Sequence, residues 1–218
     1  MVYELSRIIC RLVFFFCFRW EVYGRENILG AKGGIIAVNH TSFLDPALVG
    51  VPIPGGIYYM AKKELFENRL AGWYFRKLHA IPLDRDKPSI TMLKKLINLV
   101  REGNLVLMFP EGTRSTDGSL GKGRGGVGML AAKSRATIYP CYIMGAGDAL
   151  PKGGGFFRPG KIRVTFGRPT RYDKLYDSTP SKRAYEEISR SIMGEIAKLK
   201  KSMQDMLVPV KARNGQSR

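Results

Sequence analysis

The chain has 218 residues, of which 44% are hydrophobic, so it is long enough to bury one sizeable core. Its 36 Lys and Arg residues against 18 Asp and Glu residues give a formal charge of +18, which implies an anionic partner: a membrane, a phosphorylated substrate or a nucleic acid. Three cysteines without CxxC spacing and only two histidines argue against a structural zinc site or a disulfide framework, and we expect neither a metal nor a cofactor.

The most hydrophobic stretch of the chain runs from Ile8 to Trp20. It is shorter than the roughly 20 apolar residues of a membrane span, and it has no small-residue cleavage site of a signal peptide. We expect residues 1–23 to form a helix that lies in the headgroup region and anchors a peripheral or monotopic protein to the cytoplasmic face of an anionic membrane; the alternative is a helix buried in the core. The side chains predicted to contact lipid are Arg11, Phe14, Phe15, Phe16, Phe18 and Trp20.

Beyond Gly24, short β-branched runs alternate with segments of helical period. Apolar runs predict buried strands at residues 34–38, 56–60, 105–109 and 136–139, and alternation predicts a strand with one wet face at 161–166, near an edge of the sheet. Helices are expected from Pro46, from residues 86–88 to Gly103, and after Thr179-Pro180, where an apolar stripe extends to Met206. The pattern predicts an α/β fold with a mixed, mostly parallel sheet covered by helices on both faces, preceded by the membrane-associated helix and followed by a basic flexible tail at 208–218.

A histidine and a carboxylate follow the first predicted buried strand. His40 stands just past the strand end, where open α/β sheets bind ligands, and Asp45 comes five residues later, where it can fold back and orient the imidazole. An imidazole held in this way can act as a general base towards a hydroxyl group. Backbone amides of the turn from Asn39 to Ser42 are candidates to stabilise an oxyanion. Taken singly, His40 and Asp45 have a commoner alternative, which is a turn residue and a helix cap.

Two further polar turns carry arginines, which hold phosphate through paired hydrogen bonds. The strand at 105–109 leads into a turn with Glu111 and Arg114, and a turn at residues 80–85 contains Arg85. The glycines at 121, 123 and 126 have the spacing of a dinucleotide fingerprint, but no strand precedes them, so we expect a flexible loop near a phosphate or headgroup instead.

Four ordered motifs within residues 20–170 together resemble the glycerolipid acyltransferase family. They are Asn-His-x4-Asp at 39–45, Ile-Pro-Leu-Asp-Arg at 81–85, Phe-Pro-Glu-Gly-Thr-Arg-Ser at 109–115 and Ile-Tyr-Pro at 138–140. The resemblance implies an acyltransferase domain over 24–207 that moves a fatty acyl group from a thioester donor to the free hydroxyl of 1-acyl-glycerol 3-phosphate (lysophosphatidic acid), giving phosphatidic acid. It implies His40 as the base and Asp45 as its partner. The acceptor and phosphate contacts that it implies are Arg85, Glu111, Gly112, Thr113, Arg114, Lys122 and Arg124.

Several alternatives follow from the same residues. The acceptor could instead be glycerol 3-phosphate or another lysophospholipid, and the donor either acyl-CoA or acyl carrier protein. No Gly-x-Ser-x-Gly elbow occurs, so direct transfer without an acyl-enzyme is the simpler scheme. An alternative function of another class is that of a basic module that binds a membrane or a nucleic acid without catalysis. Nucleic acid is not expected, because the aromatic residues gather in the N-terminal segment and the strands and do not interleave with Lys and Arg.

Overall fold

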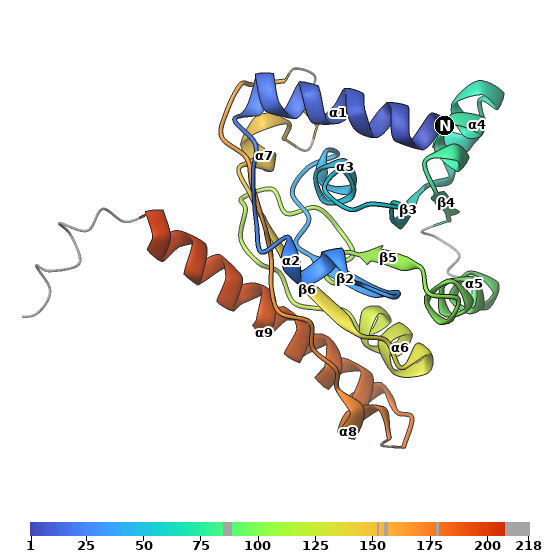
Figure 1. Ribbon diagram of the computed structural model, residues 1–218. Helices are drawn as coiled ribbons and strands as arrows, with labels where there is room; N and C mark the ends of the chain where they lie inside the picture. Colours follow the sequence, from blue (N-terminus) through green and yellow to red (C-terminus); the bar gives the residue numbers. More distant parts are fainter. Residues whose placement is uncertain (85–88, 152, 155–156, 178, 208–218) are drawn as a thin grey trace, which may run out of the picture.

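A mixed β-sheet forms the centre of the computed structural model, which describes residues 1–84, 89–151, 153–154, 157–177 and 179–207 (Figure 1). In these ranges the sheet has seven strands in the order β1-β7-β6-β2-β5-β3-β4. β2 to β6 run parallel to one another, whereas β7 is antiparallel to β6 and carries β1 beside it. The strands are β1 (Glu21–Tyr23), β2 (Gly34–Val38), β3 (Tyr58–Lys62), β4 (Ala80–Leu83), β5 (Leu105–Met108), β6 (Ile138–Met144) and β7 (Arg163–Phe166).

Helices cover both faces of this sheet, as the sequence predicted (Figure 1). α1, α2, α3 and α7 share one apolar core with the sheet, and α5, α6, α8 and α9 share the core on the opposite face. The helices of the described ranges are α1 (Val2–Phe18), α2 (Glu26–Leu29), α3 (Asp45–Gly50), the 3-10 helix η1 (Lys63–Phe66), α4 (Arg69–Lys77), α5 (Ile90–Arg101), α6 (Gly125–Ser134), α7 (Ala146–Ala149), α8 (Asp173–Tyr176) and α9 (Lys182–Leu207).

The central strand β2 shows why the apolar runs of the sequence do not alternate. Ile35 and Ala37 belong to the core beneath α5, α6 and α9, whereas Ile36 and Val38 belong to the core beneath α1 and α3. Every residue of β2 is buried because helices cover both faces. The parallel strands place their carboxyl ends at one edge, and the segment with His40 follows β2 there.

The N-terminal helix is both a core element and an exposed one. α1 ends at Phe18, Arg19 adopts a left-handed conformation (φ 40°), and residues 21–23 leave the expected helical segment to form β1 at the edge of the sheet. Phe14 and Phe18 are each 2% exposed in the core, so the prediction that these two side chains insert into lipid is wrong. They lie on the face of the helix that packs against the domain. Trp20 is half-buried against Phe14, with 5.6 Å between ring centroids.

The opposite face of α1 is exposed and almost wholly apolar. Phe15 is 67% and Phe16 is 76% exposed, and Arg11 is exposed beside them. In the described part of the chain, no helix has the length and apolar character needed to cross a bilayer. The other exposed large apolar side chains of α1 are Leu5, Ile8, Ile9, Leu12 and Val13.

Other differences from the sequence predictions concern short elements. Residues 80–83, expected as a turn, form the edge strand β4, and the glycine-rich loop ends early because α6 begins at Gly125. β1 and α4 were not predicted. The stripe of α9 is buried through Met203, but Met206 is 55% exposed. Arg85 and the tail at 208–218 lie outside the described residues.

Candidate active site

His40 and Asp45 meet at the carboxyl end of β2. Asp45 is the first residue of α3, and the short turn between strand and helix folds its carboxylate back beneath the imidazole. The distance from His40 Nδ1 to Asp45 Oδ2 is 2.8 Å. The Asp45 side chain is fully buried, whereas the His40 side chain is 12% exposed. The pair therefore has one buried member and one member open to solvent.

Asp45 also organises the turn itself. The same oxygen, Oδ2, accepts hydrogen bonds from the backbone N–H groups of Thr41 (2.8 Å) and Ser42 (2.9 Å). An oxygen that already receives two N–H donors is an acceptor towards the ring as well, so Nδ1–H of His40 donates and Nε2 carries the lone pair. The imidazole stacks on the Phe109 ring at 3.7 Å between centroids and an angle of 16°. Its orientation is thus fixed from two sides.

Glu111 joins the His40 turn to the segment that follows β5. Its Oε1 accepts the backbone N–H of His40 at 3.2 Å, and its Oε2 accepts the N–H of Gly121 at 3.0 Å. The backbone carbonyl of His40 accepts the N–H of Ser115 at 2.7 Å. Glu111 is 6% exposed, so its bonds lie away from solvent, and they join the turn after β2 to the loop between β5 and α6.

These contacts correct the expectation for the oxyanion. The N–H groups of His40, Thr41 and Ser42 already donate to the two carboxylates, so the turn does not offer them to a reacting oxygen. The side-chain amide of Asn39 exchanges two hydrogen bonds with the backbone of Ile143 on β6 (2.8 and 2.9 Å), which ties the turn to that strand. The turn is built to position the imidazole.

Beside the turn lies a basic cavity of about 550 Å³. Gly112 lets the side chain of Arg124 pack closely against the backbone, because its φ is +72° and a Cβ there would lie 2.9 Å from Cδ of Arg124. Lys122 and Arg124 are exposed. The sequence-predicted residues that line the cavity are Glu111, Thr113, Arg114, Lys122 and Arg124.

Arg114 connects the basic cavity to the His40 turn. Its guanidinium carbon lies 3.9 Å from the centroid of the Phe43 ring, and Phe43 stands between His40 and Asp45 in the sequence. Phe43 is 60% exposed, and one face of its ring is covered by this guanidinium. Phe43 was not predicted as a site residue; an aromatic residue inside a polar motif was the available signal.

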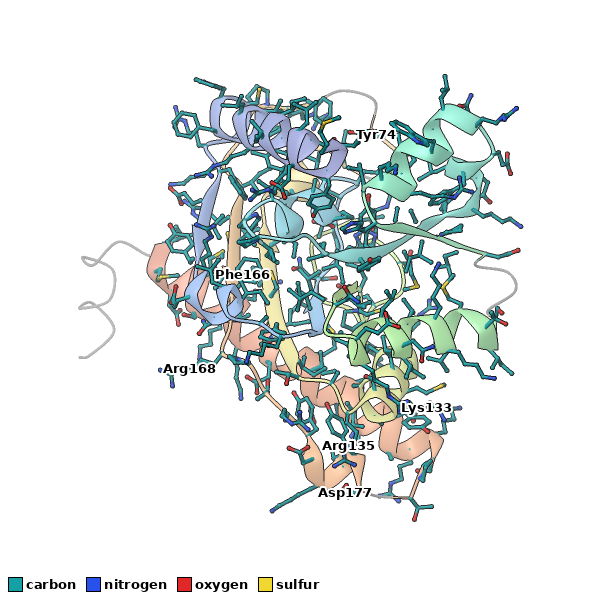
Figure 2. All side chains as sticks on the ribbon, turned by 45° about the vertical axis from the view of Figure 1, so that its right-hand side comes forward. Tyr74, Lys133, Arg135, Phe166, Arg168 and Asp177 are labelled. Atoms are coloured by element: carbon teal, nitrogen blue, oxygen red, sulfur yellow. The ribbon has the colours of Figure 1, made fainter. Side chains whose placement is uncertain are left out.

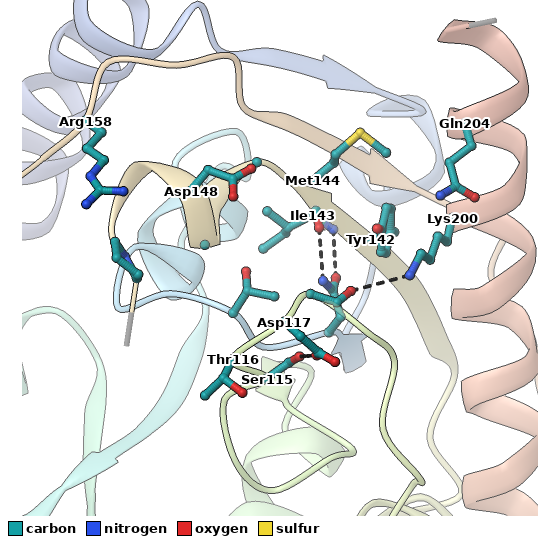
Figure 3. Close-up of a pocket in the computed structure, with 16 residues that line it drawn as sticks. Ser115, Thr116, Asp117, Tyr142, Ile143, Met144, Asp148, Arg158, Lys200 and Gln204 are labelled. Atoms are coloured by element: carbon teal, nitrogen blue, oxygen red, sulfur yellow. Dashed lines mark hydrogen bonds between the residues drawn. The ribbon is translucent and has the colours of Figure 1, made fainter. Parts of the chain in front are cut away.

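A second cavity, of about 540 Å³, lies on the other side of the segment Ser115–Asp117, which lines both (Figure 3). Figure 3 shows Lys200 and Gln204 of α9 on one side of it and Arg158 on the opposite side. Lys200 Nζ donates to the carbonyl of Gly118 at 3.4 Å. Hydrogen bonds from Ser119 lower the pKa of Asp117 to about 2, and because Asp117 lines both cavities, each of them carries this negative charge beside its cations.

The described residues at this edge of the sheet provide neither a reactive thiolate nor a metal-binding site. Burial raises the pKa of the Cys141 thiol well above its usual value, and the neighbouring Asp45 charge raises it further. Within the described ranges, no group of three or more His, Cys, Asp or Glu side chains is placed to hold a metal ion. The arrangement supplies an oriented base and a cluster of cations.

Comparisons with known proteins agree with this arrangement. The family model described as Acyltransferase matches residues 19–144. A 1-acyl-sn-glycerol-3-phosphate acyltransferase of Bacillus subtilis (strain 168) is 33% identical over 187 residues, which cover 85% of this chain and 90% of that protein. A chloroplastic 1-acyl-sn-glycerol-3-phosphate acyltransferase of Brassica napus is 32% identical over 76% of this chain, which spans about half of the plant protein (50%).

A solved structure supports the same relationship. The 1-acyl-sn-glycerophosphate (LPA) acyltransferase PlsC from Thermotoga maritima aligns with a TM-score of 0.74 at 26% identity, covering 91% of this chain and 79% of that one. A fold with an oriented histidine at the carboxyl edge of a mostly parallel sheet defines the class, and the family match covers more than half of the chain. The chain belongs to the acyltransferase family.

Proposed function

We propose that the chain transfers a fatty acyl group from a thioester donor to the free hydroxyl of 1-acyl-glycerol 3-phosphate, giving phosphatidic acid. The observation that carries the proposal is the contact between Arg114 and Phe43, because a guanidinium beside the turn of the oriented His40 supports a role for Arg114 in binding phosphate. The names of the relatives, which are 1-acyl-sn-glycerol-3-phosphate acyltransferases, support this acceptor.

Capture of the acceptor falls to the basic cavity. Arg114, Lys122 and Arg124 would hold the phosphate by charge-assisted hydrogen bonds, and Arg85 remains a predicted fourth cation outside the described residues. Glu111 is already occupied by two backbone N–H groups, so we assign it to positioning and not to direct contact with the acceptor. Gly112 and Thr113 shape and line the wall.

The chemistry falls to His40. Its Nε2 takes the proton of the acceptor hydroxyl, whose oxygen attacks the thioester carbonyl. When the tetrahedral intermediate collapses, the new C–O bond remains, the C–S bond breaks, and the proton passes from the imidazolium to the leaving thiolate. Asp45 stabilises the imidazolium during the interval in which it is charged. No acyl-enzyme is required.

A panel of substrates with the purified protein tests the proposal. Mixed vesicles would present 1-acyl-glycerol 3-phosphate, glycerol 3-phosphate or a lysophospholipid with a larger headgroup, each with acyl-CoA or with acyl carrier protein, and mass spectrometry would identify the product. We expect phosphatidic acid from the first acceptor, formed at least about 100-fold more slowly with His40→Ala. Acylation only of another acceptor would overturn the substrate, and vesicle binding without any acyl transfer would indicate a binding module.

For membrane association, the proposal is a peripheral or monotopic protein on the cytoplasmic face, held by the exposed face of α1. Seven large apolar side chains stand exposed on this helix, and the net charge of +18 favours anionic lipid. Deleting residues 1–20 would be a poor test because it would also remove Phe14 and Phe18 from the core.

A sharper variant changes only the exposed face of α1. Leu12→Ser, Phe15→Ser and Phe16→Ser together should weaken vesicle binding and slow transfer to bilayer acceptor more than to a short-chain soluble analogue. Met206→Ser is the matched control, because Met206 is 55% exposed on α9, which covers the opposite face of the sheet. Unchanged vesicle cosedimentation of the triple variant would refute the role of α1.

A further inference from the structure

We propose that α4 forms a second contact with the anionic lipid bilayer, beside α1. This inference rests on the proposed membrane association and adds an element that the sequence did not predict. α4 would lie in the headgroup layer, so that the domain contacts lipid through two helices, α1 and α4.

The exposed side of α4 is an apolar stripe at helical spacing. Leu70 is 81% exposed, Trp73 is 52% exposed and Tyr74 is 40% exposed. Positions i, i+3 and i+4 of a helix lie on one face, so these three side chains form a single patch. Trp and Tyr are the residues that favour the boundary between lipid and water.

The other side of α4 packs against the preceding 3-10 helix η1. Gly72 is buried, and a Cβ at this position would lie 2.7 Å from the carbonyl oxygen of Phe66. The side chain of Asn68 caps the helix by accepting the N–H groups of Leu70 and Ala71 at 3.0 Å. α4 is therefore a capped and packed helix, and its apolar stripe lies on the outward side.

The patch on α4 is next to the N-terminal end of α1. Tyr74 Oη and Ser6 Oγ form a hydrogen bond of 2.9 Å between the two helices. Figure 2 shows Tyr74 between α4 and α1, and in Figure 1 α4 stands beside the N-terminal end of α1. A small cavity of about 80 Å³ separates the helices and is lined on these sides by Tyr3, Ser6 and Tyr74. The two apolar surfaces therefore lie close enough to meet one bilayer.

Charge selects an anionic lipid surface as the occupant. The nine residues of α4 include Arg69, Arg76 and Lys77 and no acidic residue. All three basic residues are exposed, and they flank the apolar stripe as in a helix that lies in the headgroup layer. An acidic bilayer satisfies both features at once, whereas a second copy of this chain would bring a further charge of +18 to the same face.

Two helices in contact with lipid would fix how the domain is turned. If only α1 lay in the interface, the domain could still rotate about the long axis of this helix. A second contact through α4, to one side of α1, would restrict that rotation. The His40 edge would then keep one orientation relative to an acceptor that is embedded in the bilayer. α4 would contribute to activity on bilayer substrate without touching the reacting atoms.

Fluorescence of Trp73 gives a direct test, because the chain has only two tryptophans and Trp20 is half-buried against Phe14. With Trp20→Phe as the background, Trp73 is the single emitter. On addition of anionic vesicles we expect its emission to shift to shorter wavelength, and we expect quenching when the lipids carry bromine at shallow acyl positions. Cosedimentation on the same samples reports total binding.

The outcomes separate this inference from the proposed role of α1. If the protein cosediments but Trp73 is neither shifted nor quenched, α4 lies outside the bilayer and the inference fails while membrane association stands. If the protein does not cosediment, both fail. A blue shift that grows with protein concentration in the absence of vesicles would show that a second copy covers α4, which would also overturn the inference.

Variants of the stripe provide the second measurement. Leu70→Ser with Trp73→Ser should weaken vesicle binding by roughly tenfold, which corresponds to the loss of a modest apolar contact. The thermal melt should be unchanged because both side chains are exposed, and Met206→Ser serves again as the control. The double variant should lose activity on bilayer acceptor and keep activity on a short-chain soluble analogue. Vesicle affinity equal to that of the control would overturn the proposal.

Discussion

The turn that carries His40 and the cavity wall that carries Arg114 belong to one site but are held in different ways. In the turn, Asp45 is fully buried, and the two carboxylates of Asp45 and Glu111 accept the backbone N–H groups of three successive residues. In the cavity wall, Lys122 and Arg124 are exposed, and Arg114 is stacked on an exposed ring. The turn is held by internal hydrogen bonds, whereas the cavity wall presents Lys122 and Arg124 to solvent and keeps Arg114 half-buried.

This difference matches the two tasks of a transferase that acts on a phosphorylated acceptor. Proton transfer requires a base in a fixed position, and in the proposed mechanism the buried carboxylates would hold His40 in such a position. Capture of a charged substrate requires exposed cations that can exchange water for phosphate. Substitutions in the turn should therefore act mainly on kcat, and substitutions in the cavity wall should act mainly on the acceptor KM.

The largest effect is expected for His40→Ala. Removing a general base should lower kcat by about 10²- to 10⁴-fold, while the acceptor KM stays within a few-fold because the phosphate contacts remain. Steady-state kinetics at varied acceptor concentration measure both constants, and a thermal melt checks the fold. A variant with nearly normal turnover would remove His40 from the mechanism.

The second-largest effect is expected for Asp45→Asn. The amide oxygen can still accept the turn N–H groups, but the stabilising charge beneath the imidazolium is lost. A charge-assisted hydrogen bond contributes on the order of 1.5 to 3 kcal/mol, so kcat should fall by roughly 10- to 150-fold. The double variant with His40→Ala should be no slower than His40→Ala alone, because the two residues act as a unit. Additive losses would contradict that coupling.

Arg114→Ala tests the role of the cavity wall. Loss of one charge-assisted phosphate contact should raise the acceptor KM by about 10- to 100-fold and leave kcat within a few-fold. Arg114→Lys keeps the charge but lacks the planar fork, so it should recover only part of the affinity. If the donor KM rose instead, the cavity would have to be reassigned to phosphates of the donor.

Glu111→Gln tests the link between the two regions. Only one oxygen remains as an acceptor, so the N–H of His40 or of Gly121 loses its partner, at a cost of about 1–3 kcal/mol in the free energy of unfolding. We expect a lower melting temperature and a decrease in kcat of about tenfold or less. An unchanged kcat with a raised acceptor KM would return Glu111 to acceptor binding.

The sequence predicted the contact between His40 and Asp45 better than the hydrogen bonds by which Glu111 joins the His40 turn to the loop after β5. Buried strands ending in polar motifs were readable because apolar runs and strand ends follow general rules, and the contact between His40 and Asp45 follows from a separation of five residues. The bonds from Glu111 to His40 and Gly121 join segments that lie 71 and 10 positions apart in the chain, and no local pattern encodes them. Local spacing shows which residues are near a strand end, but not which polar groups they satisfy.

The errors at the N-terminus have a similar cause. An apolar helix with aromatic residues all round predicts lipid contact on every side, but α1 turns Phe14 and Phe18 to the core and Phe15 and Phe16 to solvent. Composition cannot make that division, because all four side chains are alike and only the sheet beneath the helix distinguishes them. α4 was missed because a short helix with Gly72 at its centre lacks a clear helical signal.

The smallest expected effect belongs to Phe43, where the two regions touch. Its ring stacks on the guanidinium of Arg114 at 3.9 Å and would hold that side chain over the cavity without contacting the reacting atoms. A cation–π contact at an exposed site is worth about 0.5–1 kcal/mol, so Phe43→Leu should raise the acceptor KM by roughly two- to fivefold and leave kcat unchanged. Phe43→Tyr keeps the aromatic face and should restore the original KM, which separates stacking from simple packing. In the Arg114→Ala background, Phe43→Leu should have no further effect on KM, because the cation that it positions is gone. A drop in kcat, or an equal KM effect in both backgrounds, would show that Phe43 acts on the His40 turn and not through Arg114.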